Sequence, residues 1–271
     1  MEETLSRRII DSNIAMHRNE APFYDLIHAE IFNKHEQERL CSVLRRVDSL
    51  VEANNRIALD FGAGTGNITG KLLDLGYRVT AVDISAEMLE ALKNKYSAQV
   101  ATKRVSTITG DLFTVVLDPL CDKFDLITSY SVLHHLPDYA GVVRRLASLL
   151  KKGGVMYLDH EWSPNAWNRN LLERLMTNAK DRIDYEFNQR YLRKISEGRA
   201  IPKLDYDLVD YWDKKEHYLD HAIIGEVFKE MEFASAKRED YHLNRCVSFN
   251  PFYYFCKGCC KPDVSLWVAK K

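Results

Sequence analysis

Strand-like and helical patterns of apolar residues alternate along the chain from residue 56 onward. Five short apolar or β-branched runs have the length and composition of strands: residues 56–61, 77–83, 105–111, 123–131 and 155–161. Three segments between them have helical spacing: residues 66–76, 85–96 and 139–150. This alternation predicts an α/β fold in which helices cover both faces of a parallel sheet.

Two segments depart from the alternation. Residues 1–50 are mostly helical in pattern, which predicts an N-terminal helical cap ahead of a main domain over residues 51–271. Residues 162–216 follow the fifth strand and hold three tryptophans among many charges. An insertion there overhangs the edge where the strands end, so we expect a helical lid over a ligand. A helical subdomain that only packs or dimerises is the alternative.

The residues that follow the strands should meet in space. Right-handed crossovers place the carboxyl ends of all parallel strands at one edge, and ligands of such sheets bind along it. The positions concerned are the glycines of 62–66, Asp83, Asp111, residues 130–135 and residues 159–161. We therefore expect one site built from separate stretches of the chain.

The composition is that of an ordinary globular protein: 46% of the 271 residues are hydrophobic, 28% are charged and the net charge is -1. A chain without a basic excess is not expected to bind nucleic acid. No apolar run reaches membrane-spanning length and the N-terminus has no apolar signal segment, so we expect no membrane partner and a cytoplasmic protein. The six cysteines are then expected to be reduced thiols.

Three glycines at alternate positions, Gly62, Gly64 and Gly66, follow the first strand. Glycines let a backbone turn tightly and approach a ligand closely. A dinucleotide-binding turn would carry its last glycine at position 67, where this chain has Asn67. Asp60, just ahead of the glycines, would repel a pyrophosphate and attract a ligand with a sulfonium and an α-ammonium group. An NAD-dependent oxidoreductase is therefore the rival interpretation and not the preferred one.

Asp83 ends the second strand, just over twenty residues beyond Asp60. A carboxylate at this place can accept hydrogen bonds from both hydroxyls of a ribose. The expected ligand then has a ribose and a positive charge, and it needs no phosphate cradle. S-adenosylmethionine meets these conditions.

The motifs of this region resemble those of the class I S-adenosylmethionine-dependent methyltransferase family. Five stretches carry the resemblance in order: LDFGAGTGN, VTAVDIS, TGDL, FDLITSYSVLHHLPD and LKKGGVMYL. They cover about residues 50–160 closely and the tail more loosely. The resemblance implies a Rossmann-like, seven-stranded, mostly parallel sheet, with a sixth strand at 233–243 and an antiparallel last strand at 264–270. It also implies methyl transfer from S-adenosylmethionine, with S-adenosylhomocysteine as the product.

The resemblance also implies cofactor contacts, residue by residue. The residues are Gly62, Ala63 and Gly64 at the amino-acid end; Asp83 at the ribose; Ile84 and Met88 against the adenine; Asp111 and Leu112 at its amino group; and Ser129 and Tyr130 beside the methionine portion. Relatives with small-molecule acceptors often close a Tyr–Asp pair of an N-terminal helix over the cofactor, and Tyr24 and Asp25 offer that pair. Packing of an amphipathic helix is the alternative role for Tyr24.

The chemistry requires that the acceptor be positioned and, where it carries a proton, that the proton be removed. Candidates for a general base are His134 and His135, just past the fourth strand, and His160 at the end of the fifth. Capping of the following turn is the structural alternative for the histidine pair. Asp159 and Glu161 flank His160, but adjacent strand residues point to opposite faces, so we do not expect a metal there.

The connection between the last two strands is rich in cysteine, and we expect a hairpin over residues 244–262 at the ligand edge. Its cysteines are Cys246, Cys256, Cys259 and Cys260. Three interpretations compete: an aromatic-rich loop packed against the lid, a zinc clip, or a thiolate site for a soft substrate. We prefer the loop, because Cys256 and Cys259 have Cys-x2-Cys spacing but no second such pair follows.

We expect an enzyme that methylates a small molecule enclosed by the N-terminal helices and the 162–216 insertion. A protein side chain is the alternative acceptor, and a non-catalytic protein that binds S-adenosylmethionine is the alternative to an enzyme. The sequence carries no signal for the acceptor atom or for the oligomeric state.

Overall fold

The computed structural model describes residues 3–52, 55–110, 121–195, 208–209, 211–212, 218–245 and 251–271. Its strands are β1 (Ile57–Phe61), β2 (Arg78–Asp83), β3 (Val105–Thr109), β4 (Phe124–Tyr130), β5 (Leu150–Trp162), β6 (Ser235–Tyr241) and β7 (Val264–Lys270). Its α-helices are α1 (Glu3–Glu20), α2 (Tyr24–Ile27), α3 (Ala29–Phe32), α4 (Lys34–Asp48), α5 (Asn67–Asp74), α6 (Ala86–Lys95), α7 (Ser97–Ala101), α8 (Tyr139–Leu149), α9 (Leu171–Ile195), α10 (His221–Glu230) and α11 (Pro251–Cys259). Two short 3-10 helices are η2 (Leu133–His135) and η3 (Pro164–Ala166).

The strands form one seven-stranded sheet in the order β3-β2-β1-β4-β5-β7-β6. Strands β1 to β5 pair in parallel, and β7 runs antiparallel to both β5 and β6. This confirms the predicted Rossmann-like sheet with an antiparallel last strand. The chain moves outward from β1 to β3 and then returns to place β4 on the other side of β1, so the switch point lies between β1 and β4.

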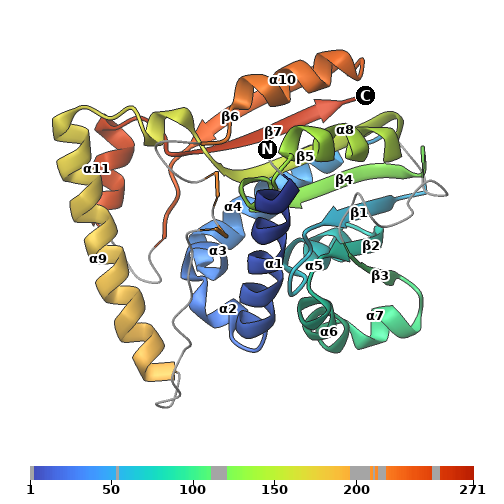
Figure 1. Ribbon diagram of the computed structural model, residues 1–271, viewed down its shortest axis with the longest axis horizontal. Helices are drawn as coiled ribbons and strands as arrows, with labels where there is room; N and C mark the ends of the chain where they lie inside the picture. The colour runs from blue at the N-terminus through green and yellow to red at the C-terminus, as the bar shows by residue number, and fades with distance from the viewer. Residues whose placement is uncertain are drawn as a thin grey trace.

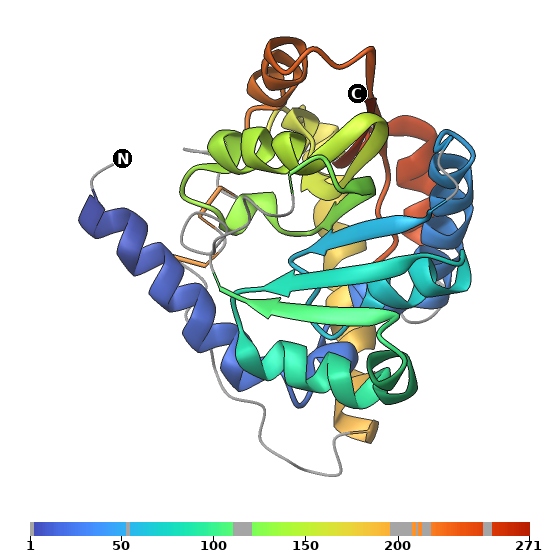
Figure 2. The same cartoon turned by 90° about the vertical axis from the view of Figure 1, so that its right-hand side faces the viewer.

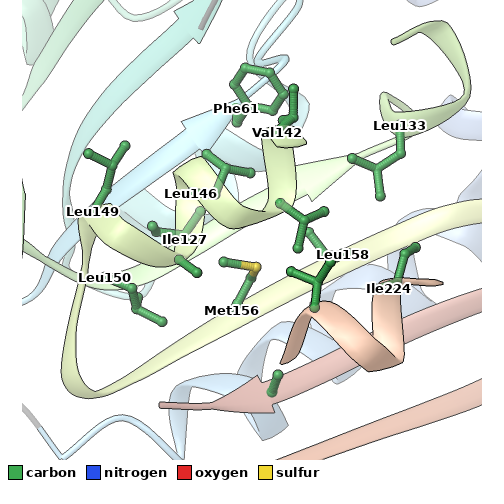
Figure 3. Close-up of a cluster of buried hydrophobic side chains, with 14 of the residues drawn as sticks. Phe61, Ile127, Leu133, Val142, Leu146, Leu149, Leu150, Met156, Leu158 and Ile224 are labelled. Carbon is green, nitrogen blue, oxygen red and sulfur yellow. The ribbon is translucent and has the colours of Figure 1, made fainter. Parts of the chain in front are cut away.

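Helices cover both faces of the sheet (Figure 1). One face packs against α8 and α10, in a core that includes Ile127, Leu146 and Ile224 (Figure 3). The other face packs against α4 and α5, where Leu44 and Leu72 are fully buried. Burial of these apolar side chains on both faces is the main stabilising contribution. The strand ends are therefore held on a rigid platform.

Local signals begin and end the helices close to the predicted positions. Ser85 caps α6, because its side chain accepts a hydrogen bond from the Met88 amide. Asp138 caps α8 by accepting a hydrogen bond of 2.8 Å from the Gly141 amide. Gly76, just after α5, has a φ of +88°, the left-handed conformation that favours glycine at a helix end.

Helix α1 lies across the carboxyl ends of the strands (Figure 2) and contacts α6 and η2. Arg18 of α1 donates a hydrogen bond of 2.8 Å to Glu87 of α6. Asp25 of α2 accepts hydrogen bonds from Thr65 in the glycine turn and from Lys95 of α6. Helices α1 and α2 therefore cover the sheet edge at which the glycine turn lies.

The connection from β6 to β7 contains helix α11, where we expected a hairpin loop. Pro251 stands at its first position, where proline suits a helix. Helix α11 packs alongside α9 (Figure 1), and its Cys256 is buried. Packing against a neighbouring helix thus stabilises as helix a stretch that looked loop-like in sequence. Cys246 lies outside the described residues. Within the described ranges, none of the helices combines the length and the apolarity that a bilayer span requires.

Candidate active site

The glycine turn lies at the switch point, directly after β1. Gly62 and Gly64 have φ values of +68° and +51°, which only glycine adopts without strain. A Cβ on Gly62 would lie 2.3 Å from Cγ2 of Val132, in the segment after β4. The Gly62 amide also donates a hydrogen bond of 2.8 Å to the carbonyl of Val82. The turn is therefore pinned between the ends of β2 and β4.

The carboxylate of Asp83 holds the turn from the end of β2. Its Oδ2 accepts a hydrogen bond of 2.8 Å from the Gly64 amide, and its Oδ1 accepts one of 2.8 Å from the Ser85 amide. The residue is only 8% exposed. Burial raises the pKa of Asp83, while the nearby His17 ring and the backbone amides oppose the rise. Each oxygen keeps a lone pair for a further donor, as a ribose hydroxyl requires.

A cavity of about 340 Å³ opens between α1 and the strand ends, and we call it the glycine-turn cavity. The predicted cofactor contacts that line it are Tyr24, Gly62, Gly64, Asp83, Ile84 and Tyr130. Those buried away from it are Asp60, Met88 and Ser129. Ala63 lines a smaller adjoining pocket, and Asp111 and Leu112 lie outside the described residues. The structure thus brings six of the predicted contacts to one cavity.

Four further residues of the glycine-turn cavity come from α1 and escaped the sequence analysis. They are Ser6, Ile10, Asn13 and His17. Their spacing puts them on one face of a helix, but a face of mixed polarity is also what an ordinary surface helix shows. Asn13 donates a hydrogen bond of 3.3 Å to the carbonyl of His135, and its Oδ1 is buried without a partner among the described residues. An unsatisfied acceptor at a cavity wall suits a ligand with a donor group.

Asp60 lies behind the glycine turn and not in the cavity wall, which differs from the expectation of direct contact. It is buried in β1, where its carboxylate accepts hydrogen bonds of 2.6 Å from Thr69 and 2.9 Å from Thr128. Burial raises the pKa of Asp60 to about 6, although both hydroxyls oppose the rise. Its register opposite Thr128 of β4 and Ala81 of β2 places it in the middle of the sheet.

Replacing Asp60 by asparagine is expected to change how stability depends on pH. The folded pKa of about 6 lies above the unfolded value, so the folded state keeps this proton up to a higher pH than the unfolded state does. The free energy of unfolding of the wild type should therefore fall by about 2–3 kcal/mol as the pH rises from 4 to 7. Asp60→Asn should not show this fall. Urea unfolding at several pH values measures the difference, with the exposed Asp74→Asn as control. Parallel curves for wild type and Asp60→Asn would contradict the assignment.

A second cavity, of about 410 Å³, adjoins the first, and we call it the histidine cavity. Four residues line both cavities: His17, Tyr24, Ser131 and His135. The other residues of its wall that matter below are Met16, His28, Glu30, His134, His160, Trp162, Asp181, Tyr185 and Arg245. All three candidate bases therefore lie at this cavity.

His134 and His135 are both held through Nδ1. His134 donates a hydrogen bond of 2.8 Å to Glu161, which also accepts bonds from the amides of residues 132–134. His135 donates a hydrogen bond of 2.9 Å to the carbonyl of Val209. Burial, and then the neighbouring His134, lower the pKa of His135 well below its usual range. Glu161 thus anchors the turn after β4, which fits the capping interpretation for His134.

Asp159 is fully buried and fully engaged. It accepts hydrogen bonds of 2.6 Å from Arg39, 2.8 Å from Tyr241 and 2.6 Å from the His160 amide, and a further one from Tyr157. Its oxygens are therefore taken by the protein itself. Among the described residues, no three histidine, cysteine or carboxylate side chains are arranged to hold a metal ion.

His28 carries a positive charge at the histidine cavity. Burial opposes its protonation, but hydrogen bonds to Glu20 at 3.2 Å and Glu30 at 2.7 Å outweigh it and raise the pKa of His28 to about 10. The ring packs against Tyr24, with 4.2 Å between centroids. Tyr24, which lines both cavities, thus packs against a fixed, ion-paired side chain.

Comparison with known proteins indicates the class of domain that this chain contains. Residues 59–158 match the family model described as a methyltransferase domain. A protein named as an uncharacterized methyltransferase, from Anoxybacillus flavithermus, is 30% identical over 50% of this chain and 60% of its own length. A ubiquinone biosynthesis O-methyltransferase from Xanthomonas axonopodis is 28% identical over 43% of this chain and 47% of its own length. The chain thus spans about half the length of the curated relatives it matches.

Solved structures share the fold at low identity. An S-adenosylmethionine-dependent methyltransferase from Mesorhizobium loti aligns over 84% of this chain and 96% of its own, with a TM-score of 0.53 and 18% identity. Phosphoethanolamine N-methyltransferase 2 from Haemonchus contortus, in complex with S-adenosyl-L-methionine, aligns over 90% of this chain and 56% of its own, with a TM-score of 0.55 and 15% identity. At such identities the likeness concerns the fold alone.

The sheet order, the glycine turn at the switch point and the carboxylate after β2 are the arrangement of a Rossmann-like fold with a cavity suited to a nucleoside. The domain match narrows this class. Residues 59–158 match the family described as a methyltransferase domain, which supports S-adenosylmethionine as the cofactor. This domain match favours a methyltransferase over the rival interpretation as an NAD-dependent oxidoreductase.

Proposed function

We propose that this chain transfers the methyl group of S-adenosylmethionine to a small molecule held in the histidine cavity. The observation that carries the proposal is the wall of four residues shared by the two cavities. A nucleoside held by Asp83 in the glycine-turn cavity would extend its sulfur end toward this wall. An acceptor in the histidine cavity would then lie against the same four residues.

Two further features support a small acceptor. The histidine cavity, at about 410 Å³, falls in the range of small-molecule sites, which is about 300–1,000 Å³. Its wall combines N-terminal helices and strand ends with Asp181 and Tyr185 of α9, so the insertion after β5 acts as part of a lid. The relatives named as ubiquinone biosynthesis O-methyltransferases act in the synthesis of a small molecule, which favours the same class of acceptor here.

Some residues of the site would bind the cofactor, and others would orient it. When bound, S-adenosylmethionine supplies a methyl group that is already activated by the sulfonium charge. Asp83 would accept the ribose hydroxyls, and the backbone of Gly62 and Gly64 would let the ligand approach closely. Tyr24 and His17 would close the cavity from the N-terminal side. Orientation of this kind contributes on the order of 7–11 kcal/mol to a two-substrate reaction in favourable cases.

Transfer of tritium from methyl-labelled S-adenosylmethionine tests the proposal. The enzyme is incubated with a metabolite extract and, separately, with a dialysed protein extract of the same cells. Label in the small-molecule fraction is the expected result. Label confined to protein would favour the side-chain acceptor instead. Binding of S-adenosylmethionine without transfer to either fraction would indicate a non-catalytic binding protein.

Replacing Tyr24 by alanine is expected to weaken binding of S-adenosylmethionine about tenfold, because the sulfonium loses an aromatic face worth about 0.5–2 kcal/mol. S-adenosylhomocysteine lacks that charge, so its affinity should fall less. Tyr24→Phe keeps the ring and is the matched control. Calorimetry with both ligands measures the difference. Equal losses for the two ligands would show that Tyr24 only packs against the helices.

A further inference from the structure

We propose that Ser131 and His160 form the proton-accepting pair of this site, and that the acceptor is therefore a hydroxyl compound. The inference rests on the methyltransferase function proposed above and adds the acceptor class to it. The Oγ of Ser131 lies 3.0 Å from Nδ1 of His160. Ser131 lines both cavities and His160 lines the histidine cavity. Ser131 thus lies where the two cavities adjoin, in hydrogen-bond contact with the imidazole of His160.

Strand register explains why these two residues meet. Tyr130 of β4 is paired with Asp159 of β5, so the next residue along each strand is Ser131 on one side and His160 on the other. The Ser131 amide donates a hydrogen bond of 2.9 Å to the Asp159 carbonyl. The His160 amide donates one of 2.6 Å to Oδ1 of the same residue. Asp159 therefore fixes the backbone of both partners.

Both residues adopt a left-handed backbone conformation. The φ of Ser131 is +59° and that of His160 is +65°. Such a conformation costs of order 1–3 kcal/mol for a residue with a side chain, and it concentrates at functional sites. The pairing of β5 with β7 also shifts between Leu158 and Glu161, the irregularity that redirects side chains at a strand end. Two strained residues facing each other at a cavity indicate a functional arrangement and not packing alone.

The ring of His160 is placed to remain neutral. It stacks on Tyr130 with 4.9 Å between centroids, and its Nε2 is buried with no partner in the part of the chain that the structure describes. Burial, followed by the charges of Arg245 and Arg39, lowers the pKa of His160 well below its usual range. His134 and His28 also lower the pKa of His160. A neutral imidazole has a lone pair to offer.

The proposed step conserves atoms and charge. The acceptor oxygen forms a bond to the methyl carbon as the carbon–sulfur bond breaks, and that electron pair stays on sulfur. The acceptor proton passes to Oγ of Ser131, and the serine proton passes to Nδ1 of His160. One positive charge, first on the sulfonium, ends on the imidazolium. After the product leaves, the imidazolium returns its proton to solvent through the histidine cavity.

Nitrogen-15 NMR of the histidine rings, recorded on the complex with S-adenosylhomocysteine, tests the pair without an acceptor. The expected result at pH 7 is a neutral His160 with its proton on Nε2 and a hydrogen-bonded, unprotonated Nδ1. Ser131→Ala should shift the Nδ1 resonance of His160, whereas the exposed Ser97→Ala should not. A proton on Nδ1, or a charged ring at pH 7, would overturn the proposal.

Kinetics with two simple probes test the acceptor class. Phenol must lose a proton during transfer, whereas thiophenol is already ionised at neutral pH. Ser131→Ala and His160→Gln are expected to slow methylation of phenol by about 10²–10⁴-fold, with a smaller loss for thiophenol. The loss for phenol should shrink as the pH rises toward its own ionisation. His35→Gln, an exposed histidine of α4, is the control. Equal losses for both probes at all pH values would overturn the proposal.

The experiment with the metabolite extract distinguishes the hydroxyl acceptor proposed here from the methyltransferase function on which it rests. Labelled ethers among the products support the hydroxyl class. Label found only on amines or thiols would overturn the inference and leave the methyltransferase function standing. Transfer to no acceptor at all would remove the function itself, while the NMR result would still decide the arrangement of the pair.

Discussion

Arg39→Met is expected to lower the free energy of unfolding by about 3–5 kcal/mol, because it leaves two buried carboxylates without their cation. Arg39 donates hydrogen bonds of 2.8 Å and 2.6 Å to Glu36 and one of 2.6 Å to Asp159. The side chains of Glu36 and Asp159 are 2% and 0% exposed, and that of Arg39 is 21% exposed. The guanidinium also lies 3.9 Å from the ring centroid of Tyr241. Methionine keeps much of the volume but none of the charge.

The matched control lies on the same helix. Arg46 pairs with Glu239 at 2.7 Å, but its side chain is 49% exposed. Solvent screens such a pair, so Arg46→Met should cost less than about 1 kcal/mol. Urea unfolding at pH 7 measures both variants. Equal decreases in the free energy of unfolding of the two variants would show that the buried cluster stabilises the fold no more than a surface ion pair does.

The loss in Arg39→Met should also depend on pH. Burial already raises the pKa of Glu36 with the arginine present, and removing the cation raises it further. A group whose folded pKa lies above its unfolded value contributes stability at low pH and loses it as the pH rises. The variant is therefore expected to recover part of its deficit when the pH falls from 7 to 5. A deficit that stays constant over this range would contradict the burial of the freed carboxylates.

Asp83→Ala is expected to weaken binding of S-adenosylmethionine about 100-fold, or by about 2.7 kcal/mol, because hydrogen bonds to a charged group contribute about 1.5–3 kcal/mol. The carboxylate would accept the ribose hydroxyls while its other lone pairs hold the amides of Gly64 and Ser85. S-adenosylhomocysteine carries the same ribose, so both ligands should lose affinity equally. This pattern differs from that expected for Tyr24→Ala.

Calorimetry measures the affinity of Asp83→Ala, with the exposed Asp74→Ala as the control. A urea unfolding curve for each variant separates a lost ribose contact from a loosened fold. Unchanged affinity for S-adenosylmethionine would mean that the ribose binds elsewhere. Similar losses for Asp83→Ala and Asp74→Ala would point to a general electrostatic effect.

The fold follows from local patterns to a large extent. Each predicted strand occurs, and β4 is buried at every position, its polar residues Asp125, Thr128 and Ser129 included. The helix that Ser85 caps begins one residue later, at Ala86. The exception is α11, where helix formation depends on packing against α9. Periodicity describes one element at a time and carries no information on which distant helix will lie beside it.

The site likewise contains residues that local sequence patterns predict and residues that only the tertiary structure reveals. The structure places Gly62, Gly64 and Asp83 at the glycine-turn cavity, and the sequence could single them out because each stands at or just after the end of a strand. Asp60 was assigned a direct contact, but its buried hydrogen bonds to threonines of α5 and β4 place it behind the turn. Asp111 and Leu112 stay predictions, as do the catalytic roles of the three histidines.

By itself, the sequence determined the order of strands and helices, the glycine turn and the carboxylate that follows β2, because spacing along the chain sets these features. Only the tertiary structure decided that α1 supplies Asn13 and His17 to the cavity wall and that Arg39 neutralises Asp159. It also decided that Ser131 meets His160. These contacts join residues far apart in sequence, and their free energy depends on burial and on strand register, which no local pattern contains.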